Sequence, residues 1–407
     1  MRGADHSTRR SAGRRPRALL IAVHSAASGG AQAMALAEAE RFSERCEVVT
    51  AVPDGPLRER FAACGAVIDP TPTMPTWEGV SRSRWMLQRA RAQRDALRLA
   101  ATIRRRHIDA VLTSSSVVLA PVLAARLAGV PSLVHAREWP VTPAGEAVFR
   151  LQKRKADAIV AISAGVAGLL PGDGRAEVVG IHDGIDAAPP PRTEARLGSP
   201  LRLCVIGSLT AGDGKGQHRA VEALAELSAH GIDATLSVVG PVLDQEYGER
   251  VSRVARERGV ADRVEITGPV DDVPGLLEAH DVLLFCSRQG ADVTPLVIME
   301  ALVAERPVVA ADVGSVAEVM PDGECGSLVP PEDPRAMAAA IAALVADPER
   351  AREQARRGAA RIRARFDRDA GLRSLWDEIV TVCTKSPSQV PTTYARSFHD
   401  PSAPFDR

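Results

Sequence analysis

The feature that most constrains the fold is a regular alternation of short apolar segments with helical segments. The apolar segment Val282–Phe285 is followed by a polar loop, a short helical segment and a second apolar segment, Pro307–Ala311. Strand and helix alternating over so few residues indicate a parallel sheet, because parallel strands need a crossover between them. Ligands bind beyond the carboxyl ends of such strands, so the loop Ser287–Thr294 is a candidate binding loop.

The same alternation runs along most of the chain and predicts two α/β domains. Further strands are expected at Ala18–Ser25, Val48–Val52, Ala66–Ile68, Asp109–Thr113, Ser132–His135, Ala158–Ile162, Leu201–Ser208, Thr235–Gly240 and Val264–Thr267. The Pro-rich segment 187–200 between the two regions is interpreted as a hinge linker. The expected organisation is a disordered basic tail (1–17), a first domain (18–186), the linker, a second domain (201–370), a final helix returning to the first domain (371–385) and a disordered tail (386–407).

Composition excludes several classes of protein. The 407 residues suffice for two domains with full cores, and 51 acidic residues balance 51 basic ones, so no global attraction to nucleic acid is expected. The six cysteines are scattered without a CxxC pair, which indicates neither a zinc site nor a disulfide framework. No apolar run is long enough to span a bilayer. A cytoplasmic protein without a nucleic-acid partner is predicted.

Two segments have alternative interpretations. Arg9-Arg10 followed by an apolar run superficially resembles a twin-arginine export signal, but the run is short and also makes a good first strand, which we favour. The segment Ser81–His107 carries nine arginines interleaved with apolar residues at approximately helical spacing. It is either an ordinary helix with one solvated face or a basic surface for peripheral contact with the inner face of a membrane or with an acidic acceptor.

A glycine-rich turn, Gly207–Gly216, follows a predicted strand and opens a helix, which is the context of a phosphate-binding loop. It matches neither the P-loop nor the GxGxxG fingerprint. Lys215 either neutralises a diphosphate there or solvates a helix end. Asp292 and Glu300 flank the candidate binding loop and are interpreted as acceptors for ligand hydroxyls, although a loop aspartate and a solvated helix glutamate would look the same.

Several motifs occur in the order found in one enzyme family. They are Gly29-Gly30, His135-Ala136-Arg137-Glu138, Ala161-Ile162-Ser163, Asp183–Asp186, Lys215-Gly216-Gln217, Gly268-Pro269-Val270, Asp292–Glu300 and Gly314–Gly326. Over about residues 18–383 the chain resembles the retaining glycosyltransferases of the GT-B fold, usually called family 4. The resemblance implies two Rossmann-like domains facing each other across a cleft, with the nucleotide-sugar donor bound by the second.

The resemblance also implies roles for individual residues. Glu300 would bind the donor ribose, Asp292 the sugar hydroxyls, and Lys215 the leaving diphosphate. The catalytic candidates are thus Lys215, Asp292 and His135. The remaining donor-site candidates are Gly29, Gly30, Ser208, Pro269, Val270, Thr294, Leu296 and Val297. The family acts commonly without a metal ion, so no metal and no cofactor are expected. The only Asp-x-Asp, at 367–369, lies by the final helix.

The chain departs from the family pattern at two positions. Asp292 stands where the family has glutamate, which shortens the reach of the carboxylate by one methylene. Ser208 stands where an arginine usually accompanies the lysine, so one cation is missing from the diphosphate site. Arg288, in the adjacent loop, is a candidate replacement unless it is simply solvated. His135, likewise, is either a ligand of the donor or a hydrogen-bonded core residue.

These observations predict a retaining glycosyltransferase that moves a sugar from a nucleotide-diphosphate sugar to a hydroxyl or amine of a small or lipid-linked acceptor. Two alternatives remain open. One is another sugar-nucleotide enzyme on the same fold, either an epimerase or a pseudo-glycosyltransferase. The other is a non-catalytic sugar-nucleotide-binding protein, for which the missing arginine leaves room.

Overall fold

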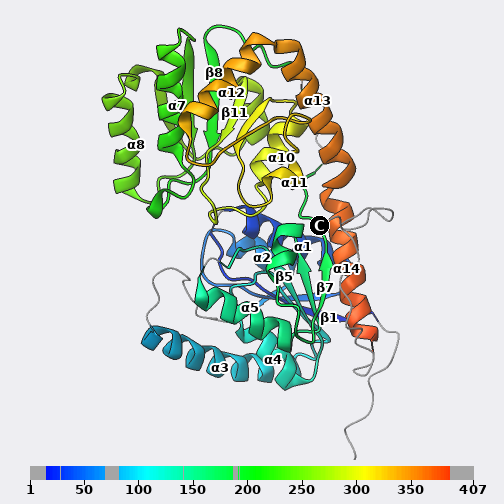
Figure 1. Cartoon of the computed structure of the whole chain (residues 1–407). Coiled ribbons are helices and arrows are strands. Elements are labelled where there is room, and N and C mark those ends of the chain that lie inside the picture. Colours follow the sequence, from blue (N-terminus) through cyan, green and yellow to red (C-terminus); the bar gives the residue numbers. More distant parts are fainter. Residues whose placement is uncertain are drawn as a thin grey trace, which may run out of the picture. The chain divides into compact units, whose positions relative to one another are not determined.

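The computed structural model describes residues 15–385, apart from residues 28, 69–81, 141, 187–190 and 192. The chain divides into two compact units (Figure 1). Unit 1 contains the residues up to His182 together with those from Ala370 onwards, and unit 2 is Asp183–Asp369. Of the predicted tails 1–17 and 386–407, residues 1–14 and 386–407 lie outside the described residues. Arg17 does not behave as a disordered tail residue, because its amide donates to Asp109 Oδ2 at 2.7 Å and its carbonyl accepts from Glu47 N at 2.8 Å.

Unit 1 is built on a seven-stranded parallel sheet with the order β3-β2-β1-β4-β5-β6-β7. The strands are β1 (Ala18–Ala22), β2 (Glu47–Ala51), β3 (Ala66–Ile68), β4 (Ala110–Thr113), β5 (Ser132–Ala136), β6 (Ala158–Ala161) and β7 (Glu177–Gly180). All six strands predicted for this region are confirmed to within a few residues, including the favoured strand at Ala18, and β7 was not predicted.

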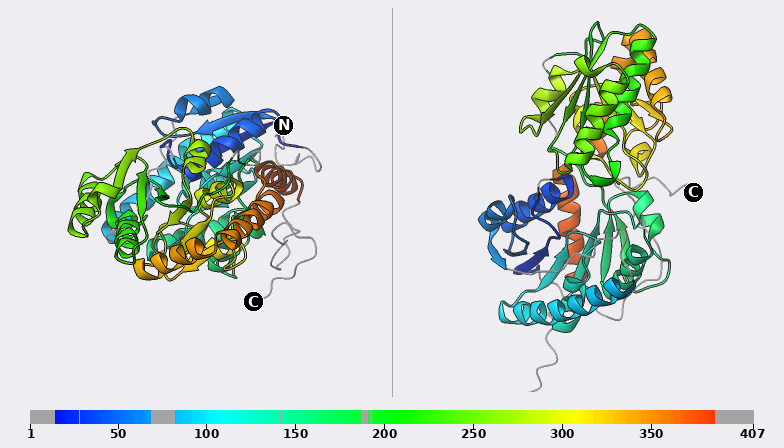
Figure 2. Two further views of the ribbon diagram at one scale, coloured as in Figure 1. Left: turned by 90° about the horizontal axis from the view of Figure 1, so that it is seen from above. Right: turned by 90° about the vertical axis from the view of Figure 1, so that its left-hand side faces the viewer.

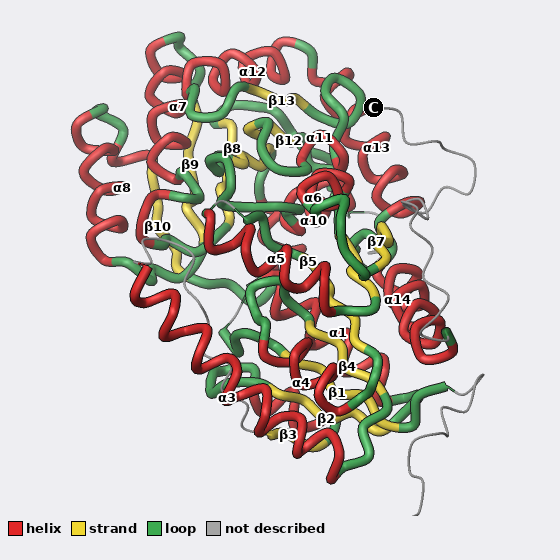
Figure 3. The backbone as a smooth tube through the Cα atoms, turned by 60° about the horizontal axis from the view of Figure 1, so that its bottom comes forward, coloured by secondary structure: helices red, strands yellow, loops and turns green. Residues whose placement is uncertain are grey.

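Helices cover both faces of this sheet (Figure 3). They are α1 (Gly30–Ser43), α2 (Arg58–Cys64), α3 (Arg82–Arg105), α4 (Ala120–Ala128), α5 (Pro143–Lys155) and α6 (Ala164–Leu169). Successive residues of β1 point to opposite faces. Leu19 and Ile21 pack with α1 and α2, whereas Leu20 and Ala22 pack with α3 and α4.

The last helix, α14 (Arg368–Thr384), contributes most of its buried side chains to unit 1. Leu372, Trp376 and Ile379 belong to the same apolar cluster as β1 and α1. The Trp376 ring lies 5.4 Å from the ring of Phe42, measured between centroids. Figure 2 shows α14 in red beside the blue elements from the start of the chain. Unit 1 is therefore assembled from both ends of the described chain.

Unit 2 contains a six-stranded parallel sheet with the order β10-β9-β8-β11-β12-β13. Its strands are β8 (Leu201–Ile206), β9 (Ala234–Val239), β10 (Val264–Gly268), β11 (Val282–Phe285), β12 (Val308–Ala311) and β13 (Ser327–Val329). Its helices are α7 (Gln217–Ala229), α8 (Gln245–Glu257), α9 (Val273–Ala279), α10 (Leu296–Val303), α11 (Val316–Val319), α12 (Pro334–Ala346) and α13 (Pro348–Arg365). The five predicted strands are confirmed, and β13 was not predicted.

The described part of the predicted linker, residues 191 and 193–200, packs on unit 2. Ala195 and Leu197 are buried in its core. The backbone carbonyl of Ala195 accepts a hydrogen bond from Arg352, and the backbone amide of Arg196 donates to Asp281. This part of the segment therefore has fixed backbone partners, whereas residues 187–190 and 192 lie outside the described residues.

Two chain segments run side by side at the edge of unit 2. Ile185 and Asp367 form an isolated parallel bridge, with Ile185 N donating to Phe366 O at 3.0 Å and Arg368 N donating to Ile185 O at 3.1 Å. The side chains of Asp186 and Arg368 form an ion pair. At Gly184 a Cβ atom would lie 2.3 Å from the backbone oxygen of Phe366, so only glycine fits there.

We expect Gly184→Ala to destabilise unit 2 by about 1–3 kcal/mol, because the added methyl group forces the two segments apart. The comparison is with Gly198→Ala, since a Cβ atom there would meet no atom within 4 Å. Equilibrium denaturation of both variants measures the difference. Equal free energies of unfolding would contradict a steric requirement for glycine at position 184.

None of the described helices is both long and apolar enough to cross a membrane. The arginine-rich segment forms α3, as the helical spacing predicted. One side of α3 is buried through Ala96, Leu99 and Ile103, while Leu97 is 63% exposed beside the exposed residues Arg94 and Arg98. Contact of this basic face with a membrane or an acidic acceptor stays a prediction.

Candidate functional site

Polar side chains gather where each sheet reverses its strand order. In unit 2 the chain builds outwards from β8 to one edge and from β11 to the other, and β8 and β11 are neighbours. In unit 1 the corresponding neighbours are β1 and β4. At such a point the loops after two adjacent strands diverge, and the crevice between them is where open α/β sheets bind ligands.

In unit 2 this position is occupied by an ion pair between Lys215 Nζ and Asp292 Oδ1. Lys215 comes from the glycine-rich turn after β8, and Asp292 from the loop after β11. The hydroxyl of Ser287 donates to the second oxygen of Asp292 at 2.5 Å. Lys215 retains 31% exposure of its side chain and Asp292 16%. The two predicted residues are thus brought together, 77 positions apart in sequence.

The glycine-rich turn is bound to the loop after β11 by hydrogen bonds from the backbone and the side chain of Arg288. Arg288 N donates to Gly214 O at 2.9 Å, and Arg288 Nε donates to Gly212 O at 3.3 Å. Gly216 has φ of +67°, and a Cβ atom there would lie 2.1 Å from the carbonyl oxygen of Cys286. The guanidinium of Arg288 therefore lies against the turn that presents Lys215.

Ser208 is half-buried at the end of β8, and the buried Gln217 amide donates to its carbonyl oxygen at 3.3 Å. Pro269 and Val270 are exposed after β10. Leu243, after β9, is 68% exposed. The loops after β8, β9 and β10 lie at one end of the sheet, because all its strands are parallel.

The amino end of α10 carries the remaining predicted donor-site residues. Thr294 precedes the helix, and Leu296 and Val297 are its first two residues; the cap residue, Pro295, makes no side-chain cap hydrogen bond. The Thr294 hydroxyl is buried and has no hydrogen-bond partner among the described residues. Backbone N–H groups in a first turn without a side-chain cap favour an anion.

Glu300 lies one turn into α10 and is half-buried. Burial raises the pKa of its carboxyl above the ordinary value, and the positive charge of Arg368 acts in the opposite direction. Within the described residues its carboxylate accepts no hydrogen bond. A hydroxyl donor from a ligand would supply one, which suits the ribose role that the family resemblance implies.

In unit 1, Gly29 and Gly30 are exposed at the start of α1, whose first turn contains no acidic residue. His135 is only 3% exposed at the end of β5. Its Nδ1 lies 2.7 Å from Glu38 Oε1, and Arg137 Nη2 donates to the same oxygen at 2.6 Å. The structure therefore places His135 in a buried ionic network.

Glu38 is the centre of this network and was missed in the sequence. It is fully buried on α1 and also accepts a hydrogen bond from Ser114 at 2.6 Å. Burial would raise the pKa of Glu38, but Arg137, His135 and Ser114 together lower it to about 2. The sequence could have indicated its burial, because Glu38 lies at helical spacing between Ala35 and Phe42 and therefore on the apolar face of α1.

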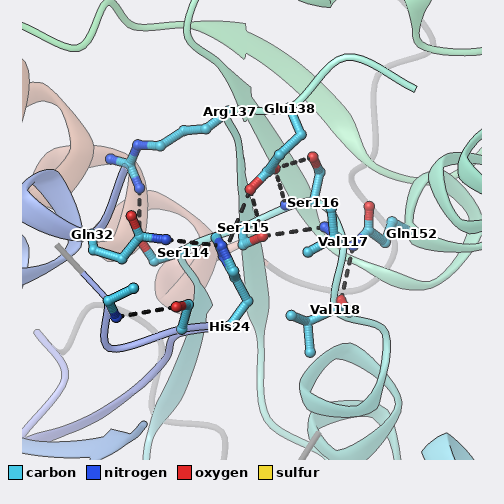
Figure 4. A network of polar contacts seen from close by, with 12 residues as sticks. His24, Gln32, Ser114, Ser115, Ser116, Val117, Val118, Arg137, Glu138 and Gln152 are labelled. Carbon is cyan, nitrogen blue, oxygen red and sulfur yellow. Dashed lines mark hydrogen bonds and ion pairs between the residues drawn. The ribbon is translucent and has the colours of Figure 1, made fainter. Parts of the chain in front are cut away.

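A second polar cluster lies beside the first in unit 1 (Figure 4). Glu138 follows β5 and accepts hydrogen bonds from Ser115 and Ser116, which follow β4. His24, which follows β1, lies 3.8 Å from Glu138. Neither Glu138 nor any of Ser114, Ser115 and Ser116 was singled out from the sequence as an individual site residue. In the described part of the chain, no three His, Cys, Asp or Glu side chains are arranged to hold a metal ion.

Comparison with known proteins finds sequence similarity to glycosyl transferases in unit 2. Residues 200–347 match the protein family described as Glycosyl transferases group 1. The chain is 31% identical over 203 residues to a glycogen synthase of Mycobacterium tuberculosis, covering 48% of this chain and 46% of that protein. It is 33% identical over 178 residues to a GDP-mannose-dependent phosphatidylinositol monomannoside mannosyltransferase of Mycolicibacterium smegmatis, covering 40% and 45%. The chain thus matches less than half the length of these relatives.

The similarity in three dimensions extends over both units. The solved structure of HepE from Anabaena, in complex with UDP and glucose, matches with a TM-score of 0.73 and 20% identity, covering 88% of this chain and 98% of that one. At this level of identity the match shows the fold, and the prediction of a GT-B fold is confirmed. The chain therefore has the GT-B fold, and residues 200–347 of unit 2 are similar to the family described as Glycosyl transferases group 1.

Proposed function

We propose that the protein is a retaining glycosyltransferase that binds a nucleotide-diphosphate sugar on unit 2. The observation that carries this proposal is the Lys215–Asp292 ion pair at the point where the strand order of unit 2 reverses. The proposal combines the cation of this pair with two further groups that a nucleotide sugar requires: the amino end of α10 for the diphosphate and the carboxylate of Glu300 for a ribose hydroxyl. The family match supports the same substrate class.

Positioning and charge stabilisation account for the catalysis in this proposal. Lys215 and the amino end of α10 stabilise the negative charge that grows on the departing diphosphate, and the leaving phosphate itself takes the acceptor proton. Arg288 adds a second cation at the edge of the glycine-rich turn. Asp292 has two tasks, because one oxygen orients Lys215 while the carboxylate also meets the sugar hydroxyls.

The nucleotide base is the first property to establish. The solved HepE structure contains UDP, whereas the mycobacterial relative is named as GDP-mannose-dependent. A thermal-shift screen with UDP-, GDP-, ADP- and dTDP-sugars identifies the donor, because a ligand that binds the folded state raises its apparent stability. Detection of a glycosylated product, rather than a rearranged donor or bound donor alone, separates transfer from the epimerase and the non-catalytic alternatives.

We expect Glu300→Ala to weaken donor binding by roughly tenfold or more, since a hydrogen bond to a charged group contributes about 1.5–3 kcal/mol. The measurement is the donor concentration that gives half of the maximal thermal shift. Glu257→Ala serves as the control, because that glutamate is exposed on α8 and 65% of its side-chain surface is accessible. An unchanged donor affinity in Glu300→Ala would mean that ribose does not bind at α10.

A further inference from the structure

Unit 1 carries a carboxylate that is fixed in place and partly open to solvent. Ser115 Oγ donates to Glu138 Oε1 at 2.6 Å, and Ser116 N donates to Oε2 at 2.7 Å. The hydroxyl of Ser116 donates to Oε2 as well. Both serines are fully buried, whereas the side chain of Glu138 remains 24% exposed. Three donors from one loop therefore fix the orientation of a carboxylate that a ligand can still reach.

The position of Glu138 matches that of a ligand-binding group. It follows β5, its serine partners follow β4, and His24 follows β1, so all three segments leave the sheet at its carboxyl end. β1 and β4 are the neighbours between which the strand order of unit 1 reverses. This is the edge at which parallel sheets bind their ligands.

The charge of Glu138 is not balanced by a basic side chain. Arg137 extends away from Glu138 towards Ser114 (Figure 4). Its guanidinium is ion-paired with Glu38. In the described part of the chain, no lysine or arginine is ion-paired with Glu138, and the only cation candidate is His24 at 3.8 Å. Burial lowers the pKa of His24, against the opposing effect of the Glu138 charge, which disfavours the cationic form of its imidazole.

The carboxylates of Glu38 and Glu138 thus differ in their burial and in the charge of their partners. Glu38 is buried and bonded to Arg137 and His135, whereas Glu138 is accessible and bonded only to neutral donors. An ordered carboxylate with only neutral partners binds a cationic group more strongly than a neutral donor, since a charge-assisted hydrogen bond is roughly twice as strong as a neutral one. A hydroxyl group would satisfy the same oxygens with a smaller gain.

We infer that the acceptor is an amino-substituted sugar or cyclitol, whose ammonium group pairs with Glu138 while a neighbouring hydroxyl receives the transferred sugar. This inference rests on the proposed function, in which unit 2 binds the donor, and it assigns the acceptor to unit 1. Glu138 acts as a specificity-determining group and takes no part in bond making.

The test compares matched probes on the full chain. Glucose, three of its monoamino-deoxy forms with the amino group on carbon two, three or six, and their N-acetyl derivatives are titrated. Their dissociation constants are measured by ligand-observed NMR. We expect at least one amino form to bind about tenfold more tightly than both glucose and its own N-acetyl derivative. In Glu138→Gln this preference falls to near one, whereas Glu138→Asp, which keeps the charge, retains part of it.

Glu146→Gln is the matched control, because Glu146 is a surface glutamate of the same unit that pairs with Arg150. We expect this variant to keep the full preference for the amino form. Equal binding of amino and hydroxyl forms, no binding of any amino form, or a preference that persists in Glu138→Gln would each overturn the inference. A failed donor screen with an intact amine preference would count against the proposed function instead, because these titrations contain no donor.

Discussion

Lys215→Ala is expected to lower kcat/KM by about a hundredfold to a thousandfold, which is the usual effect of removing one group that stabilises charge in a transition state. Lys215 is the cation at the point where the strand order of unit 2 reverses, and its partner Asp292 is an anion. Without the lysine, the Asp292 carboxylate would repel the departing diphosphate. The loss should therefore exceed that of one favourable contact.

Steady-state kinetics with the donor from the thermal-shift screen measure this effect. A fall mainly in kcat would show that Lys215 acts on the leaving group, whereas a rise only in KM would show uniform donor binding. Lys155→Ala is the control, because Lys155 is an exposed lysine at the end of α5 in unit 1. If the two variants retained equal activity, the diphosphate would have to bind elsewhere.

The fold was largely predictable because its strands are short, apolar and buried on both faces. A strand in a sheet that helices cover on both faces has a nearly continuous apolar sequence. Leu201–Ile206 and Val282–Phe285 have such sequences and were therefore recognisable as strands. The strand β7 was missed because its sequence is EVVG, in which only Val178 and Val179 are apolar. The Pro-rich linker was interpreted from its prolines, but Ala195 and Leu197 anchor it to the core of unit 2.

The candidate site was predictable residue by residue but not as an arrangement. Lys215 and Asp292 were each selected from a local motif, and their contact depends on β8 and β11 being neighbours. The unit 1 network was harder to foresee, because Glu38 and His135 are separated by 97 positions. A charged residue on the buried face of an amphipathic helix indicates a partner, but the sequence does not say which residue it is.

Glu38→Gln should give the largest loss of stability, about 3–5 kcal/mol in the free energy of unfolding, because it leaves the buried Arg137 without its counter-charge. The side chains of Glu38, His135 and Arg137 are exposed by only 0%, 3% and 2%, so water screens the pair very little. Glu40→Gln is the control on the same helix, since Glu40 forms an exposed pair with Arg60. Chemical denaturation of both variants measures the difference, and equal stabilities would mean that the buried network does not stabilise unit 1.

The pH dependence of stability provides an independent check on Glu38. The pKa of this carboxyl is about 2 in the folded protein and near its ordinary value of 4.5 in the unfolded chain. A lowered pKa contributes stability that is fully present above pH 4.5 and is lost as the pH falls towards 2. The wild-type protein should therefore lose more stability than Glu38→Gln over this interval, because glutamine does not titrate. Denaturation curves at several pH values between 2 and 5 measure the two slopes, and parallel slopes would show that Glu38 is not the group whose ionisation stabilises the fold.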